Sequence, residues 1–318
     1  MNVGRQPMGD TSRQHELKFL FGEFYLFSAR FGALSAAQFS DGGCGTEAFV
    51  PSFRNLDREV EVVALNSVPV NGTYPRLALV GGALRYVVAQ YPRYYVEVQG
   101  TFEDYLKHFS SKTRSTLRRK VRRFEELSKG AIYFREYRTS QELEGEFHPS
   151  AIQLARRTYQ HRLLGAALPD SQDFIERMKE LAARDQVRAY LLFHEGKAVA
   201  YLYCPAEGGA LHYAYLGYDP GLAEWSCGTV LQYLALERIF AEGKFGVFDF
   251  TPGEGEQKKL FGTVMKRCAD IHYFRLTLRN AALVGIHVML GVASRQTVRF
   301  LDRIGLKRGI KRVLRRGW

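Results

Sequence analysis

Two short polar segments on either side of an apolar helix carry the residue types best suited to chemistry. Ser226-Cys227-Gly228-Thr229 precedes a long apolar run, and Asp249 follows Phe248 in the next apolar strand. Small residues at a helix start let the free backbone N–H groups and the positive end of the helix approach a phosphate, because no side chain intervenes. The first segment therefore predicts a pyrophosphate-binding turn. The structural alternative is an ordinary helix N-cap.

Asp249 and Lys258 frame a polar loop that follows the strand. A carboxylate at this place could take a proton from an incoming ammonium group or position the acceptor. The structural alternative is that Asp249 caps the loop, a common use of Asp. Lys258 offers a point charge to an oxyanion or a carrier phosphate. Its alternative is a solvated lysine, and the neighbouring Lys259 competes for the role.

Aromatic residues line the strand expected at 210–218. Strict alternation places Tyr213 and Tyr215 on one face and His212 on the other. A phenol such as that of Tyr215 could reprotonate a leaving thiolate, whereas core packing is the structural reading of an aromatic residue in a strand. The candidate catalytic residues are therefore Asp249, Lys258 and Tyr215.

The hydrophobic pattern predicts the elements that position these residues. Residues 187–194, 198–205 and 210–218 alternate with period two and are separated by short glycine-containing turns, which indicates an antiparallel meander. A helix that is apolar on most faces follows Gly228 and ends at Gly243. Further strands are expected within 60–99 and at 132–137, 247–250 and 271–278, and further helices behind Thr101, at 111–129, at 149–164 and behind Ser171.

This element order from 110 to 278, with the small-small-Gly turn and the Asp-Phe-x-x-Gly…Lys stretch from Asp249 to Lys258, resembles the GNAT acetyltransferase superfamily. Within it, the chain resembles the CelD/BcsL-like branch, which is related to Fem-type peptidyltransferases. The resemblance implies an α+β fold whose central sheet is mixed, mostly antiparallel and flanked by helices. Two features depart from the pattern: AEWSCG replaces the Arg/Gln-x-x-Gly-x-Gly/Ala turn, and Gln257 stands where Tyr usually precedes the Lys.

The resemblance implies acyl transfer from acetyl-CoA or another acyl-CoA to an amine, without a metal. Coenzyme A would lie where the strand ending near Gly217 splays from the strand at Phe248. Its pyrophosphate would sit at Ser226, Cys227, Gly228 and Thr229. The implied acceptor is a sugar, a nucleotide-sugar or a cell-envelope or exopolysaccharide precursor. Two alternatives stay open: an acyl carrier protein or aminoacyl-tRNA as donor, and a non-catalytic adaptor that docks on a membrane.

The formal charge of +12 is concentrated in two segments. Residues 111–129 hold eight basic residues against two acidic ones, and residues 295–318 hold nine against Asp302 alone. In the second segment basic residues recur every four positions, a basic amphipathic pattern suited to an anionic membrane surface or an acidic partner such as acyl carrier protein. A solvated helix end is the alternative. Nucleic acid binding lacks a recognisable motif, apart from tRNA in the alternative reading.

Cysteine spacing and apolar runs suggest a compartment. The four cysteines are far apart and form no CxxC or metal-spaced set, which indicates reduced thiols in the cytoplasm. The apolar stretch 281–293 is shorter than the roughly 20 residues that span a bilayer, and the first ten residues show no secretory pattern. We expect a strand-rich lobe at 1–100, an acyltransferase domain at 101–279 and a basic helical tail at 280–318, in a cytoplasmic protein peripheral to the membrane. By analogy with two-lobed relatives, the first lobe could be a degenerate second GNAT lobe.

Overall fold

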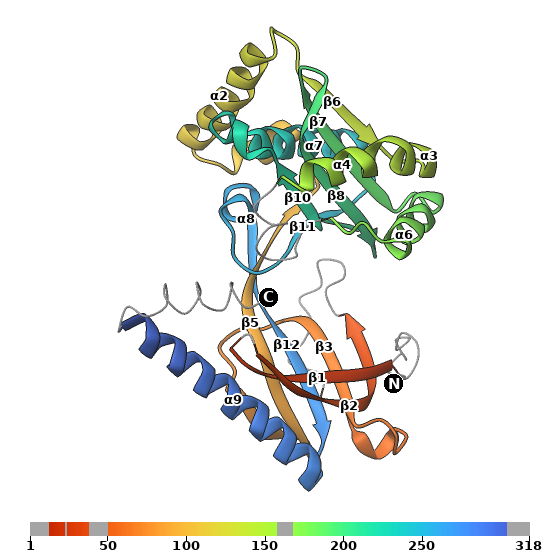
Figure 1. Cartoon of the computed structure of the whole chain (residues 1–318), viewed down its shortest axis with the longest axis vertical. Coiled ribbons are helices and arrows are strands. Elements are labelled where there is room, and N and C mark those ends of the chain that lie inside the picture. The colour runs from red at the N-terminus through yellow and green to blue at the C-terminus, as the bar shows by residue number, and fades with distance from the viewer. Residues whose placement is uncertain (1–12, 23, 38–49, 158–167, 304–318) are drawn as a thin grey trace. The chain divides into compact units, whose positions relative to one another are not determined.

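The computed structural model describes residues 13–22, 24–37, 50–157 and 168–303, and these residues form two compact units (Figure 1). Of these residues, unit 1 comprises 13–22, 24–37, 50–90 and 267–303, and unit 2 comprises 91–157 and 168–266. The boundaries between the two units fall within the strands at 83–97 and 264–275, so each of these strands belongs in part to both units. The functional division at residues 100 and 279 that the sequence suggests stays a prediction.

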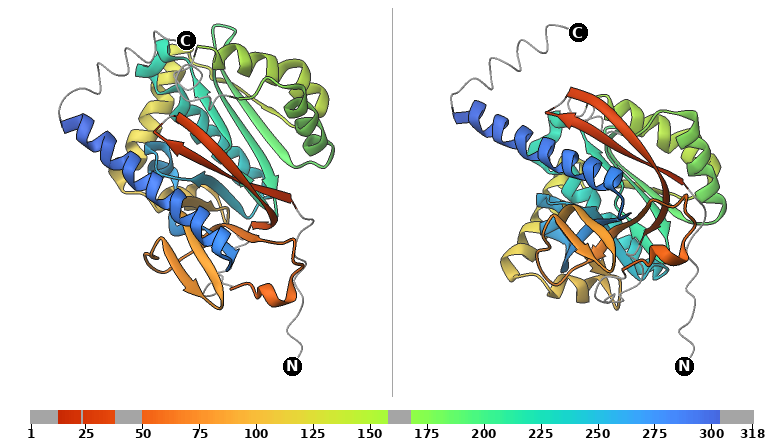
Figure 2. Two further views of the ribbon diagram at one scale, coloured as in Figure 1. Left: turned by 60° about the horizontal axis from the view of Figure 1, so that its bottom comes forward. Right: turned by 90° about the horizontal axis from the view of Figure 1, so that it is seen from below.

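Unit 1 is a sheet covered by one long helix, α9 (Figure 2). Its strand order is β1-β2-β3-β12-β5-β4, and β2 pairs with β3 in parallel. No helix in the described ranges is long and apolar enough to cross a membrane. The elements are β1 (Arg13–Phe21), β2 (Phe24–Ala37), η1 (Phe53–Asn55), β3 (Val62–Pro69), β4 (Leu77–Val80), β5 (Ala83–Glu97), β12 (Val264–Arg275) and α9 (Leu278–Arg303).

The first two strands were not predicted from sequence. Near the hairpin turn the apolar residues run consecutively from Phe24 to Phe27, so period two is absent there. Leu17, Phe19 and Phe31 from this hairpin nevertheless form a core with Val284 of α9. The basic tail predicted at 280–318 is a helix up to Arg303, and residues 304–318 lie outside the described part of the chain.

Unit 2 contains a second run of strands with helices on both faces. Its strand order is β5-β11-β9-β8-β7-β6, and β10 pairs with β8 alone. The elements are α1 (Phe102–Lys107), α2 (Ser111–Leu127), β6 (Tyr133–Tyr137), α3 (Ser140–Glu142), η2 (Leu143–Phe147), α4 (His148–Ala155), α6 (Gln172–Ala183), β7 (Val187–His194), β8 (Lys197–Glu207), β9 (Ala210–His212), β10 (Tyr215–Tyr218), η3 (Pro220–Trp225), α7 (Cys227–Glu242), β11 (Val247–Pro252) and α8 (Glu256–Phe261).

The predicted meander and its helices are confirmed in this unit. The antiparallel pairs β7–β8 and β8–β10 form the predicted meander, β6 adds a further antiparallel strand beside β7, and α7 ends at Gly243 in the left-handed conformation. Thr101 caps α1 through a capping box, and Ser171 caps α6. In the helix predicted around 149–164, α4 ends at Ala155, and residues 158–167 lie outside the described ranges.

Two apolar cores cover opposite faces of this sheet. On one face α1, α2 and α7 bury Leu211, Phe248 and Phe250. On the other face η2, α4 and α6 pack on Tyr201 and Tyr203. Successive strand residues point to opposite faces, so the residue after Leu211 in β9 and the residue between Phe248 and Phe250 in β11 point to the second face.

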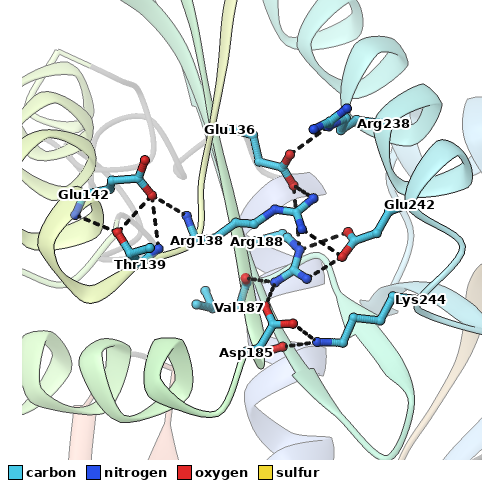
Figure 3. Close-up of polar contacts among 10 residues, drawn as sticks. All are labelled: Glu136, Arg138, Thr139, Glu142, Asp185, Val187, Arg188, Arg238, Glu242 and Lys244. Carbon is cyan, nitrogen blue, oxygen red and sulfur yellow. Dashed lines mark hydrogen bonds and ion pairs between the residues drawn. The ribbon is translucent and has the colours of Figure 1, made fainter.

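A buried arginine joins the meander to the end of α7 (Figure 3). Arg188 of β7 is fully buried, and its guanidinium donates to Glu242 of α7, to Asp185 and to the backbone oxygen of Val187. Lys244 also pairs with Asp185. Burial of a guanidinium is tolerated only with such a complete set of acceptors.

Candidate active site

A break in the strand order opens the sheet at the end of β9. Residues 210–212 pair in parallel with 247–249 of β11, but the next strand, β10, pairs with β8 alone. Tyr213 still donates its N–H to the oxygen of Asp249 at 2.8 Å, and Ala214 turns away to donate to Tyr203 at 3.2 Å. The edge of β10 on the β11 side thus has no strand partner in the described residues.

This break corrects the alternation predicted for the strand. Tyr213 packs against Phe248 and Phe250, whereas Tyr215 packs against Phe174 and Tyr203 on the opposite face. The two residues between β9 and β10 lie outside the strand pairing, and this interruption shifts the alternation of side chains by one residue, as a β-bulge does. The prediction that Tyr213 and Tyr215 share a face is therefore wrong, and Tyr215 lies on the same face as His212.

Asp249 is fully buried and surrounded by donors from three strands. Arg93 of β5 donates its Nε at 3.0 Å to both carboxylate oxygens and pairs through Nη2 with Oδ2. His212 of β9 contacts Oδ2 through Nδ1 at 3.1 Å, and the N–H of Thr251 donates to Oδ1 at 2.9 Å. The loop-capping role considered for Asp249 is thus present, together with an ion pair that the sequence did not suggest.

The electrostatics of this cluster keep Asp249 ionised. Burial alone would raise the pKa of Asp249, but hydrogen bonds from His212, Arg93 and Thr251 and the Arg93 charge hold that pKa below its ordinary value. An ionised carboxylate only accepts hydrogen bonds, so Nδ1 of His212 must be the donor. The neutral imidazole then carries its lone pair on Nε2, which makes no hydrogen bond within the described residues.

Lys258 holds the loop that follows Asp249. Its Nζ donates to the backbone oxygens of Pro252 at 2.7 Å and Thr251 at 3.2 Å, and reaches Oγ1 of Thr251 at 3.4 Å. Burial lowers the pKa of Lys258, while Asp249 opposes that shift. Thr251 has φ +64°, a left-handed conformation that is costly for a β-branched residue, so these contacts stabilise a strained turn.

The predicted phosphate turn lies at the start of α7. Cys227, Gly228 and Thr229 are buried. The Cys227 thiol lies 3.6 Å from the backbone oxygen of Leu222 in η3, and Gln257 of α8 donates to Oγ1 of Thr229 at 3.1 Å. Ser226 adopts φ +56° and makes no side-chain cap, but its backbone oxygen accepts from the N–H groups of Thr229 and Val230. Burial raises the pKa of the Cys227 thiol to about 12, which makes it a poor nucleophile.

The glycines near this turn make room for tyrosine rings. A Cβ on Gly217 would lie 2.3 Å from the ring of Tyr201, its cross-strand partner. A Cβ on Gly228 would lie 3.2 Å from the ring of Tyr218 and 3.4 Å from Leu216. Gly217 of β10 and Gly228 of α7 therefore each have a packing role that is independent of any ligand.

The structure brings together only part of the predicted set. Asp249 and Lys258 belong to one cluster, and Tyr215 lies on the face of His212. The α7 turn is joined to α8 through the contact of Thr229 with Gln257, but it makes no hydrogen bond or ion pair with Asp249 within the described residues. Sequence reasoning assigned no role to Arg93, and the only signal for His212 was its position one residue before Tyr213. A surface depression of this unit lies elsewhere and is lined by Phe134, Arg135, Glu136, Arg138, Thr139, Glu142 and Arg238.

Residues 111–259 match the family described as Acetyltransferase (GNAT) domain. No curated protein matches the chain in sequence. FemX has a similar structure, with a TM-score of 0.51 at 11% identity over 86% of this chain and 90% of that one.

Two further structures are more distant. L-PGS from Bacillus licheniformis has a TM-score of 0.45 at 14% identity over 71% of this chain and 72% of that one. A GCN5-related N-acetyltransferase from Kribbella flavida has a TM-score of 0.34 at 15% identity over 69% and 70%. The chain thus contains a GNAT acetyltransferase domain of the CelD/BcsL-like type, and its α+β fold is that of FemX. The predicted superfamily and fold class are confirmed.

Proposed function

We propose that the protein transfers an acyl group from an acyl-CoA to an amine, with His212 as proton acceptor. The observation that carries this proposal is the Asp249–His212 contact at the end of β9, where the chain stops pairing with β11, within a GNAT domain. The acceptor is the amine of a sugar, a nucleotide-sugar or an envelope precursor, which rests on family resemblance alone.

Asp249 and Arg93 position the imidazole in this mechanism. The ionised carboxylate fixes the tautomer of His212, so that Nε2 faces the partly exposed side of the ring. Nε2 takes the proton that the acceptor amine loses as its nitrogen bonds to the acyl carbon. Asp249 is a positioning residue, because its oxygens are already occupied by donors. Tyr215, on the same face, would return a proton to the departing thiolate.

The described residues of this site fit the extended arm of coenzyme A better than its pyrophosphate. The thioester supplies an activated acyl group. The unpaired edge of β10 offers backbone groups to an extended arm, a use of strand edges known from peptide recognition. The first residues of α7 are buried, so pyrophosphate binding there requires the side chains that contact them, among them those of Tyr218 and Gln257, to move.

A carrier other than free coenzyme A is the second candidate, and the position of α2 favours it. This helix presents exposed basic residues beside η3, and the guanidinium of Arg123 lies 4.5 Å from the ring centroid of Trp225. A polyanionic donor, either acyl carrier protein or aminoacyl-tRNA, would find complementary charge there.

Acetyl-CoA is expected to raise the melting temperature. A ligand that binds only the folded state adds about 2.7 kcal/mol of stability at a hundred times its dissociation constant. Gly228→Val should abolish the shift, because the side chain crowds the helix start and displaces Tyr218. Gly285→Val is the matched control, since a Cβ on Gly285 meets nothing within 4 Å. The measurement is thermal denaturation with and without acetyl-CoA.

Thiol release with glucosamine as a probe amine then tests catalysis. If acetyl-CoA raises the melting temperature but no thiol is released with glucosamine, the acceptor is an amine other than that of glucosamine. Absence of any shift in the wild-type protein would contradict acyl-CoA as donor and favour a different carrier or the adaptor alternative.

A further inference from the structure

The outer face of α9 is apolar, although it is exposed. Its inner side packs Val284 and Val288 into the core with Phe19, and His287 contacts the hydroxyl of Tyr86 at 2.8 Å. Surface helices usually present charged residues outward. Here no Asp, Glu, Lys or Arg occurs between residues 281 and 294, and Met289 is 71% exposed. The exposed apolar residues of α9 include Ile286, Met289 and Val292.

The tip of the β1–β2 hairpin is exposed and apolar on both faces. Tyr25 is 59% exposed, and Phe24, Leu26, Phe27 and Leu20 are exposed as well. Successive strand residues point to opposite faces, so neither face of the tip is covered by a core. Its sequence, from Leu20 to Phe27, contains Glu23 as its one charged residue.

These two features adjoin each other within unit 1 (Figure 2). The N–H of Gly22 in the hairpin turn donates to Oγ of Ser294 on α9 at 2.9 Å, and the ring of Phe19 lies edge-on to His287 at 5.3 Å. The hairpin turn thus lies beside the C-terminal half of α9. We call the combined surface the apolar ridge, which consists of Leu20, Phe24, Tyr25, Leu26, Phe27, Ile286, Met289 and Val292.

We propose that the apolar ridge inserts into the interface of an anionic lipid bilayer. Charge selects this occupant, because residues 295–318, which follow the ridge in sequence, contain nine basic residues and one acidic residue, Asp302. Apolar side chains enter the headgroup region while basic ones attract anionic lipid, and aromatic rings favour that depth. A second copy of the chain fits less well, since pairing two ridges would bring two strongly basic tails together.

Vesicle co-sedimentation of the full-length protein tests the proposal. We compare vesicles of equal parts phosphatidylcholine and phosphatidylserine with vesicles of phosphatidylcholine alone. Binding should favour the anionic vesicles and weaken with salt, because each basic residue near the surface adds about fivefold to the partition coefficient. Tyr25→Ser combined with Met289→Ser should lower the partition coefficient by at least about tenfold, since two exposed apolar side chains no longer insert.

Tyr133→Ser is the matched control, because Tyr133 is a strand tyrosine of unit 2 with 56% exposure, close to that of Tyr25. It should bind as the unaltered protein does. Circular dichroism and gel filtration show whether each variant is folded and in what oligomeric state. Equal binding by ridge variant and control, or no binding by the unaltered protein, overturns the proposal. So does a dimer that the ridge variant dissociates, which would make the ridge an interface between copies.

Discussion

Replacement of His212 by Ala is expected to lower turnover about a hundred- to ten-thousandfold while acetyl-CoA still raises the melting temperature. The reason is that Nε2 of His212 is the proton acceptor in the proposed reaction, whereas the unpaired edge of β10 does not depend on the imidazole. His108→Ala serves as control, because His108 is exposed and contacts only the backbone oxygen of Tyr105 among the described hydrogen bonds. Steady-state thiol release gives the turnover.

Asp249→Asn distinguishes a positioning role from an independent one. The amide no longer fixes the imidazole tautomer, so turnover should fall. If Asp249 acts only through His212, the double variant His212→Ala/Asp249→Asn should turn over no more slowly than His212→Ala alone. The effects of substitutions on turnover are not additive when the residues act as a unit. Wild-type turnover in His212→Ala would refute the assignment of the base. A further loss in the double variant would show that Asp249 has a separate role.

Loss of the buried guanidinium of Arg188 is expected to cost about 3–5 kcal/mol of unfolding free energy in Arg188→Met. The variant leaves Glu242 partly buried without its main partner and removes the donor to Val187. Urea denaturation measures the change.

Arg177→Met is the control for this effect. Arg177 and Glu180 form an exposed pair with a 3.0 Å contact, and an exposed pair is worth about 0–1 kcal/mol. If Arg188→Met and Arg177→Met lose similar amounts of unfolding free energy, solvent screens the Arg188 contacts as well. Substitution of Glu242 by Gln should give an intermediate loss, because the amide oxygen still accepts one hydrogen bond.

The sequence pattern predicted the helices and strands around the site, because that pattern depends only on residues close together in the chain. Alternation of side-chain type with period two predicts β7 and β8, and the narrow apolar stripe that includes Leu117 and Phe124 predicts the buried side of α2. Caps at Thr101 and Gly243 gave helix ends, since their chemistry concerns only adjacent residues.

The contacts that define the candidate site could not be predicted in this way. Arg93 and Asp249 are 156 positions apart and meet only because β5 pairs with β11. The shift of Tyr215 to the face of His212 depends on two residues that leave the ladder, and strict alternation gives the opposite answer. Strands β1 and β2 escaped detection because their exposed tip is apolar on both sides.

The division of the chain imposes an order on its synthesis. Unit 1 contains β1 to β4 and the first part of β5, but its strand β3 pairs with residues of β12 from Cys268 onward, which are made only after all of unit 2. A domain emerging from the ribosome folds when its last strand is available. The continuous segment 91–266 therefore completes its own fold first, and the N-terminal strands wait with Val63 and Leu65 lacking their partner strand until residue 275 has emerged.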